Sequence, residues 1–201
     1  NKVDLFDEAD SEEGTLFLTA SGGGDVEAQL NARIDGNVAL EQAAGATGTA
    51  QVTFDGGNNQ TVNGDIVTID PDDPDFDGKT SVVATGDATD VTVNGNVGVT
   101  DAASLTNSFT VGAVGDLIVE NGAELTVYGN VNAGVISVDS SSTPAEATFD
   151  GDVVDAGLII LFEDDAHNND ATLTFKGGDF SKDETQTVNS DIIADSTDDL
   201  A

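Results

Sequence analysis

The chain has 201 residues and carries 39 Asp and Glu against 5 Lys and Arg, for a formal net charge of −34. A surface this acidic repels DNA, RNA and anionic lipid, which argues against nucleic-acid binding. The chain lacks Cys, so it forms neither disulfides nor thiolate metal sites. Val and Ile together number 31 against 12 Leu, and this excess of β-branched residues favours strands over helices.

Short runs of alternating apolar and polar residues recur along the whole chain. Such a period of two predicts strands with one buried face. Residues 26–34 (VEAQLNARI) have a partial helical period, but we assign them to a strand because they align with the strand region before Phe149. The clearest other runs are VTVNGNVGV at 91–99, ELTVYGNV at 124–131 and EATFDGDV at 146–153.

A four-residue motif follows these runs: a polar residue, Gly, Asn or Asp, and then Val or Ile. Its glycines allow a bend or a bulge after each strand. The motif positions are 22 to 39 residues apart, so we expect repeating units of irregular length. The copies are DGNV at 35–38, NGDI at 63–66, NGNV at 94–97, YGNV at 128–131, DGDV at 150–153 and the Ser variant NSDI at 189–192.

Three short segments in the first part of the chain recur in the same order in its last part, which indicates a longer repeat. The phrase QTVNGDI at 60–66 returns as QTVNSDI at 186–192, and QVTFDGG at 51–57 and RIDGNV at 33–38 return in the same order as TLTFKGG and TFDGDV. We interpret residues 1–201 as one repetitive β array, in which about 15–73 match about 134–199, with 74–133 between them. We therefore expect a segment of a longer repetitive protein.

Two all-β architectures fit these patterns. One is a parallel β-solenoid, or β-helix, with irregular rungs of about 20 residues stacked about 4.8 Å apart. The other is a set of tandem β-sandwich domains, with antiparallel strands and turns every 8–12 residues. The Val-rich strands and the Gly-Asn/Asp corners favour the solenoid, and the irregular spacing leaves the sandwich open.

Residues 91–134 (VTVNGNVGVTDAASLTNSFTVGAVGDLIVENGAELTVYGNVNAG) resemble repetitive bacterial cell-surface proteins: autotransporter passengers, rickettsial-type surface antigens and surface-layer-like β-helix repeats. Those families repeat a strand, then Gly-Asn-Val, then a Gly-rich corner. The resemblance implies a parallel β-helix displayed on the cell surface. It covers about 45 residues clearly, and no autotransporter barrel or protease motif accompanies it.

The stretch DDPDFDGK at 72–79 has the spacing of half a calcium loop. Alternate carboxylates of Asp73, Asp75 and Asp77 can converge on one hard cation, with a Gly for the sharp turn. An EF-hand needs Glu at the twelfth position, where this chain has Ala84, so the remaining ligand would be remote, such as Asp87. Calcium is the expected cofactor, and the alternative is a plain acidic surface loop.

Two weaker signals also occur in polar segments. EDDAHNND at 163–170 holds the single His, His167, among carboxylates, and we interpret it as a solvated loop between two strands. The triplet at 59–61 is a glycosylation sequon on Asn59, of a kind that often arises by chance.

The composition offers little for catalysis. The chain has no Cys, one His and no G-x-S-x-G motif, and its five basic residues are scattered. One Tyr and no Trp provide little for an aromatic sugar-binding groove. The longest apolar run, residues 156–162, is far shorter than the roughly 20 residues that span a bilayer.

We therefore expect a non-enzymatic structural protein of the cell exterior that assembles with itself. It would be a surface-layer, sheath or filament subunit, or the stalk of a displayed passenger, with acidic loops that bind cations. Its partners would be other copies of itself, without nucleic acid and without a membrane-spanning segment. The alternative is an adhesin or a calcium-dependent binding module, which an exposed patch of apolar and aromatic residues would indicate.

Overall fold

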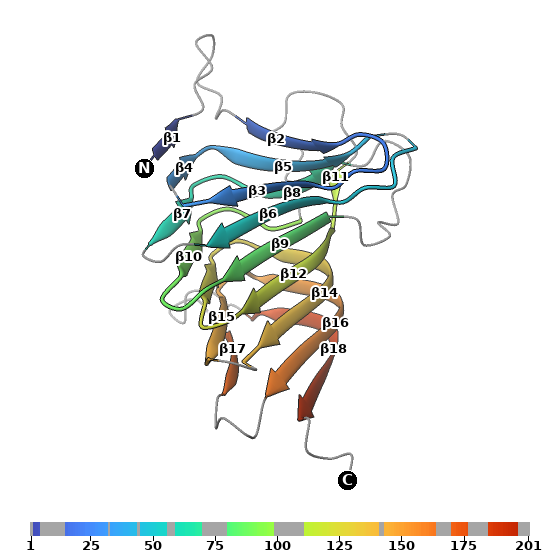
Figure 1. Ribbon diagram of the computed structural model, residues 1–201. Helices are drawn as coiled ribbons and strands as arrows, with labels where there is room; N and C mark the ends of the chain where they lie inside the picture. The colour runs from blue at the N-terminus through green and yellow to red at the C-terminus, as the bar shows by residue number, and fades with distance from the viewer. Residues whose placement is uncertain are drawn as a thin grey trace.

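The computed structural model of the chain describes residues 2–4, 15–31, 33–43, 45–55, 59–69, 80–98, 111–140, 143–163, 170–176 and 185–196. All regular structure within these residues is β-strand, in three stacks that we call faces A, B and C (Figure 1). Neighbouring strands are parallel throughout the described ladders, except that β11 runs antiparallel to β8. This confirms the all-β parallel solenoid and rules out the antiparallel sandwich.

The first four turns of the solenoid, or rungs, each contribute one strand to each face, and the later rungs contribute separate strands to faces A and C only. The described strands are, on face A, β1 (Lys2–Asp4), β4 (Arg33–Asp35), β7 (Gln60–Val62), β10 (Asp90–Val93), β13 (Glu124–Val127), β15 (Ala145–Phe149) and β17 (Ala171–Phe175); on face B, β2 (Thr15–Ala20), β5 (Asn37–Gln42), β8 (Ile66–Ile69) and β11 (Val111–Gly112); and on face C, β3 (Val26–Leu30), β6 (Ala50–Asp55), β9 (Thr80–Thr85), β12 (Val114–Glu120), β14 (Val131–Asp139), β16 (Val153–Glu163) and β18 (Thr187–Ser196).

The core consists of apolar rows that run along the solenoid axis, because parallel strands in register stack equivalent side chains. On face A the row contains Ile34, Val62, Val93 and Val127 and ends with the tilted ring pair of Phe149 and Phe175, whose centroids are 6.1 Å apart. The residue after the Gly-Asn/Asp motif begins a second row. That row is Leu16, Val38, Ile66, Val97, Val131, Val154 and Val188.

Glycine makes the corner between faces A and B possible. Gly36, Gly64, Gly95, Gly129 and Gly151 lie above one another there, and a Cβ on any of the last four would collide with the backbone carbonyl of the preceding one. Only a residue without a side chain lets the backbones approach this closely. The Gly of the repeated motif is therefore a stacking requirement of the rung.

Asn and Asp side chains tie the same corner together. The Oδ1 atom of Asn37 accepts a hydrogen bond from the backbone N–H of Asp65 (2.8 Å), and Asp65 Oδ1 accepts one from the N–H of Asn96 (2.7 Å). Asn96 and Asn130 repeat the contact with the next rung at 2.8 and 2.9 Å. The first three links join residues 28, 31 and 34 positions apart, so these rungs are longer than the expected 20 residues.

The last corners depart from the motif. At residues 150–153 one residue is added, so the N–H of Val153 takes the position of the earlier Asn or Asp, and Val154 is the inner residue. The Ser variant at 189–192 lies inside β18 and forms no corner of this kind.

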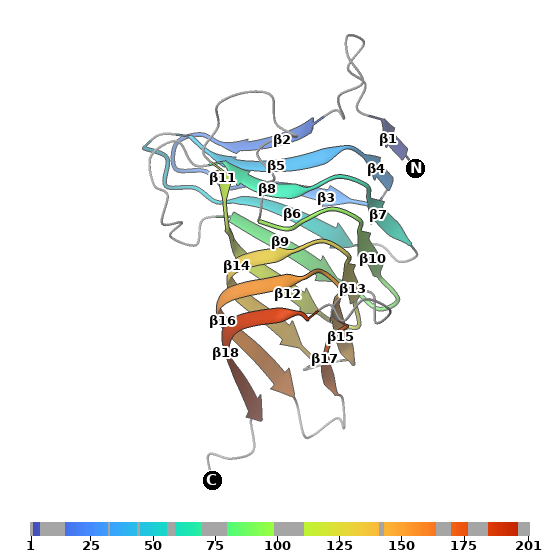
Figure 2. The ribbon, with the colours of Figure 1, turned by 180° about the vertical axis from the view of Figure 1, so that it is seen from behind.

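The solenoid narrows from its N-terminal to its C-terminal end (Figures 1 and 2). Face B is six residues wide in β2 and β5 and four residues wide in β8. Two rungs after β5, only the bridging residue Val97 continues its parallel ladder within the described residues. In β14 and β16 faces B and C form one long bent strand. Gly134 and Gly157 lie at that bend, where a Cβ would be 2.7 Å from the carbonyl oxygen of the glycine one rung before.

The two copies of the repeated sequence QTVN-Gly/Ser-DI lie at places that are not equivalent in the structure. Residues 60–66 cover β7 on face A and the corner that follows it, whereas residues 186–192 run into β18 on faces B and C. Likewise, residues 51–55 belong to β6 on face C and residues 172–175 to β17 on face A. Only the matching segments 33–38 and 148–153 lie at equivalent corners of their rungs. For the other two pairs, similar sequences occupy different faces.

The corner gives a direct test of this packing. Gly95→Ala places a methyl group against the Gly64 carbonyl oxygen and Asp65 Oδ1, so we expect it to lower the free energy of unfolding by about 1–3 kcal/mol. Gly24→Ala is the control, since a Cβ there meets nothing within 4 Å; it should change stability by less than about 0.5 kcal/mol. Urea unfolding of both variants measures the difference, and equal stabilities would contradict the stacking role of the glycine.

Candidate functional site

The N-terminal end of the solenoid exposes the edge of a rung. No described strand pairs with the outer edges of β2 and β3, which bond only to β5 and β6. Leu18 and Ala20 of this rung are buried, but four of its core-facing side chains are only partly buried, although the equivalent side chains one rung inward are fully buried. These four are Leu16, Val26, Ala28 and Leu30.

The C-terminal end shows the same condition. The described residues provide no strand beyond β17 and β18, and Leu173, Phe175 and Val188 are only partly covered. Ile192, which continues the inner row of Ile136 and Ile159, is 50% exposed, although both of those residues are fully buried. The two end rungs therefore present backbone edges and apolar side chains together, which is the chemistry that a further strand layer would cover.

The predicted calcium ligands fall mostly outside the described part of the chain. Asp73, Asp75 and Asp77 lie within 70–79, which is not described. Asp87 is an exposed residue in the turn after β9, and its Cα is 3.1 Å from where a Cβ on Gly122 would lie. Within the described ranges no three His, Asp or Glu side chains gather into a metal-sized group, and the structure leaves the calcium prediction untested.

Of the remaining residues that the sequence singled out, one lies outside the described residues and two lie within them. His167 lies in the segment 164–169, outside the described residues. Asn59 is exposed just before β7, with a left-handed φ of 41°. Tyr128 is 52% exposed at a corner of face A. No described geometry joins any two of these residues into a site.

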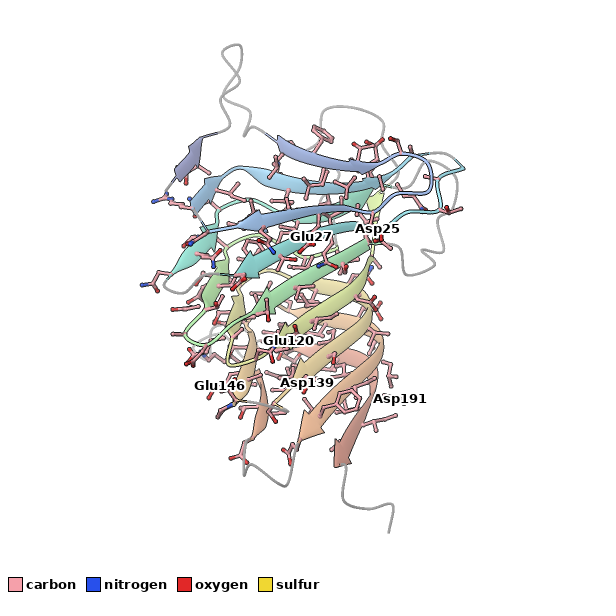
Figure 3. All side chains as sticks on the ribbon, viewed as in Figure 1. Asp25, Glu27, Glu120, Asp139, Glu146 and Asp191 are labelled. Carbon is pink, nitrogen blue, oxygen red and sulfur yellow. The ribbon has the colours of Figure 1, made fainter. Side chains whose placement is uncertain are left out.

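Carboxylates dominate the solvent-facing side chains, and Figure 3 labels several of them. Asp25 lies in the turn before β3, where a hydrogen bond from the backbone N–H of Thr49 (2.8 Å) lowers the pKa of its carboxyl. Asp116 points outward from β12 and is flanked in register by Ser81 and Val135; partial burial there raises the pKa of its carboxyl. Such shifts favour the charged form of Asp25 and the neutral form of Asp116.

An apolar patch on the outer side of face C was missed by the sequence analysis. Outward-facing Ile118, Leu158, Ile160 and Phe162 are only partly buried, and Ile193 is 50% exposed. The patch has a sequence signal: residues 158–162 (LIILF) are apolar at every position, which breaks the alternation and gives β16 two apolar sides. It was counted only as a short hydrophobic run.

Comparison of the chain with protein-family models, with curated proteins and with solved structures finds no match. Within the residues that the structure describes, no apolar helix of membrane-spanning length is present.

The raised pKa of Asp116 gives a pH-dependent prediction. A raised carboxyl pKa adds stability below the unfolded-state value, and this stability is lost as pH rises through the folded-state value. At pH 7 the charged, partly buried side chain is therefore unfavourable, and Asp116→Asn should raise the melting temperature by about 1–3 °C. Near pH 3, where the wild-type carboxyl is also neutral, this difference should shrink toward zero.

Asp155→Asn is the matched control, because it removes the same charge from an exposed position on β16. Thermal unfolding of both variants at the two pH values separates burial from net charge. An equal gain from both substitutions at pH 7 would show that burial of Asp116 has no effect.

Proposed function

We propose that this protein is a non-enzymatic structural component of the cell exterior, a surface-layer, sheath or filament subunit or a displayed stalk, which stacks on other copies of itself. The observation that supports this proposal is the pair of end rungs that no described strand covers. Each end combines parallel backbone edges with a partly exposed apolar core, so a second chain in the same orientation would continue the rows of both.

Charge makes this association conditional. At a net charge of −34, two copies repel each other at low ionic strength. Salt screens that repulsion, with a Debye length of about 8 Å at physiological ionic strength. Divalent cations held between acidic loops would lower it further. The location outside the cell is supported by the resemblance of residues 91–134 to surface-displayed repeats.

An adhesin or binding module is the second candidate function. The outer patch on face C favours it, because contiguous exposed apolar surface marks a site of interaction. A structural stalk and a binding surface can occupy the same solenoid: they share β18, but Ile192 lies on the inner side of that strand and Ile193 on its outer side.

End stacking is tested by adding one charge to an end rung. Ile192→Glu places a carboxylate on the inner row of the last rung and should shift sedimentation toward monomer over a salt series. Tyr128→Glu is the control, since Tyr128 is similarly exposed (52% against 50%) but lies on the side of the solenoid. Wild type and Tyr128→Glu should associate increasingly as salt rises. A wild-type protein that stays monomeric at every salt concentration would refute self-assembly.

Calcium binding is tested by stability with and without the ion. If the loop at 72–79 binds calcium in the folded state, a saturating concentration should stabilise the protein by about 1–3 kcal/mol, and a chelator should reverse this. Replacing Asp73, Asp75 and Asp77 by Asn should remove most of the gain.

The control for this loop variant neutralises three exposed carboxylates elsewhere, Glu124→Gln, Glu146→Gln and Asp155→Asn. It should keep the calcium-dependent gain, because it removes the same charge without touching the loop. Equal melting temperatures of the wild type with calcium and with chelator would remove calcium from the proposal.

A further inference from the structure

An apolar row crosses the outer side of face C along the solenoid axis. In register from β9 to β18 it contains Val83, which is itself buried (8% exposed), Ile118, the polar Ser137, Ile160 and Ile193. Side-chain positions next to this row widen it into a patch. They are Val135 and Leu158 on one side and Phe162 on the other. We call this surface the outer patch.

Carboxylates border the outer patch on both sides. The row that contains Val135 and Leu158 also contains Asp116 on β12 and Asp191 on β18, and the row that contains Phe162 also contains Glu120 and Asp139. Figure 3 shows Glu120 and Asp139 toward the ends of β12 and β14, and Asp191 on β18. The central row thus runs along the axis between two flanking rows that each carry carboxylates as well as apolar side chains, and we call these carboxylates the acidic rims.

The rims argue against a second copy of the chain as the occupant. Facing two outer patches would bring acidic rims together, and the whole chain has only five Lys and Arg to neutralise them. Carboxylates that are covered without a cationic partner lose hydration without compensation. Asp116 already shows this effect, because its partial burial raises the pKa of its carboxyl. An occupant with its own Lys and Arg would avoid this cost.

The backbone of the outer patch favours a helix over an extended segment. β12, β14 and β16 are each paired on both sides, so they have no free edge for an added strand. A helix satisfies its own backbone hydrogen bonds and presents one apolar stripe. The row crosses four inter-strand steps, about 19 Å at 4.8 Å each, which is about 13 helical residues.

We propose that the outer patch binds an amphipathic helix of a partner protein, with its apolar stripe on the row of Ile118 and Ile160 and its Lys and Arg against the acidic rims. This goes beyond self-assembly and gives the protein a lateral binding function on the side of the stalk. Oppositely charged rims would also accelerate the encounter of the two proteins.

The probe is a labelled synthetic peptide of about 14 residues, with Leu at helical spacing and Lys elsewhere, titrated with the full chain by fluorescence anisotropy at physiological salt. A second peptide has the same composition with Leu at every other position, and a third has Glu in place of Lys. The first should bind at least tenfold more tightly than the other two.

The double variant Ile118→Thr and Ile160→Thr keeps β-branched residues at both positions and removes apolar surface, so the fold should be retained. It should weaken binding of the first peptide about tenfold, and Glu120→Gln with Asp139→Asn should weaken it several-fold. Tyr128→Ser and the pair Glu124→Gln with Glu146→Gln on face A are the controls and should leave binding unchanged. Circular dichroism of every variant verifies the fold.

Three results would overturn the proposal. In the first, the apolar double variant binds the peptide as tightly as wild type, which would show charge attraction without a site. In the second, sedimentation of the protein alone shows a dimer that the double variant dissociates, which would make a second copy the occupant. In the third, wild type but not the double variant floats with zwitterionic phosphatidylcholine vesicles, which would make the patch a lipid contact.

Discussion

The close approach of backbones at the corner between faces A and B is the constraint on which the solenoid depends. Each of Gly64, Gly95, Gly129 and Gly151 lies so near the carbonyl oxygen of the preceding corner that a methyl group would not fit. The stacking of strands on either side follows from this contact, because it fixes both the rise and the register of each rung. The Asn and Asp side chains then bond the rungs to each other at the same place.

Parallel stacking in register also explains how charge is distributed. Equivalent side chains lie one strand spacing apart, about 4.8 Å, so like charges in one row repel. The row of Asn and Asp side chains at the corner between faces A and B avoids this repulsion. Its single charged member, Asp65, lies between Asn37 and Asn96, whose amide groups are neutral. On the outside, the acidic rows of face A, such as Glu124 beside Glu146, are exposed to solvent, where screening is strong.

The change in cross-section divides the molecule into two parts with different surfaces. The wide N-terminal rungs close with buried polar contacts: Gln42 donates to the Gly48 carbonyl oxygen (3.0 Å), and the hydroxyls of Thr68 and Thr80 bond each other (2.8 Å). The narrow C-terminal rungs have continuous bent strands and carry most of the outer patch.

The sequence by itself determined the all-β fold class and the positions of five corners between faces A and B. Alternation marked the strands and the Gly-Asn/Asp-Val motif marked five corners, because both patterns follow from local backbone geometry and from burial of one strand face. Only the tertiary structure decided which strands share a face, since that assignment depends on loop lengths that no motif encodes. For this reason the 126-residue offset between the two QTVN phrases relates strands of different faces, and the outer patch becomes visible only when Ile118, Ile160 and Ile193 align across rungs.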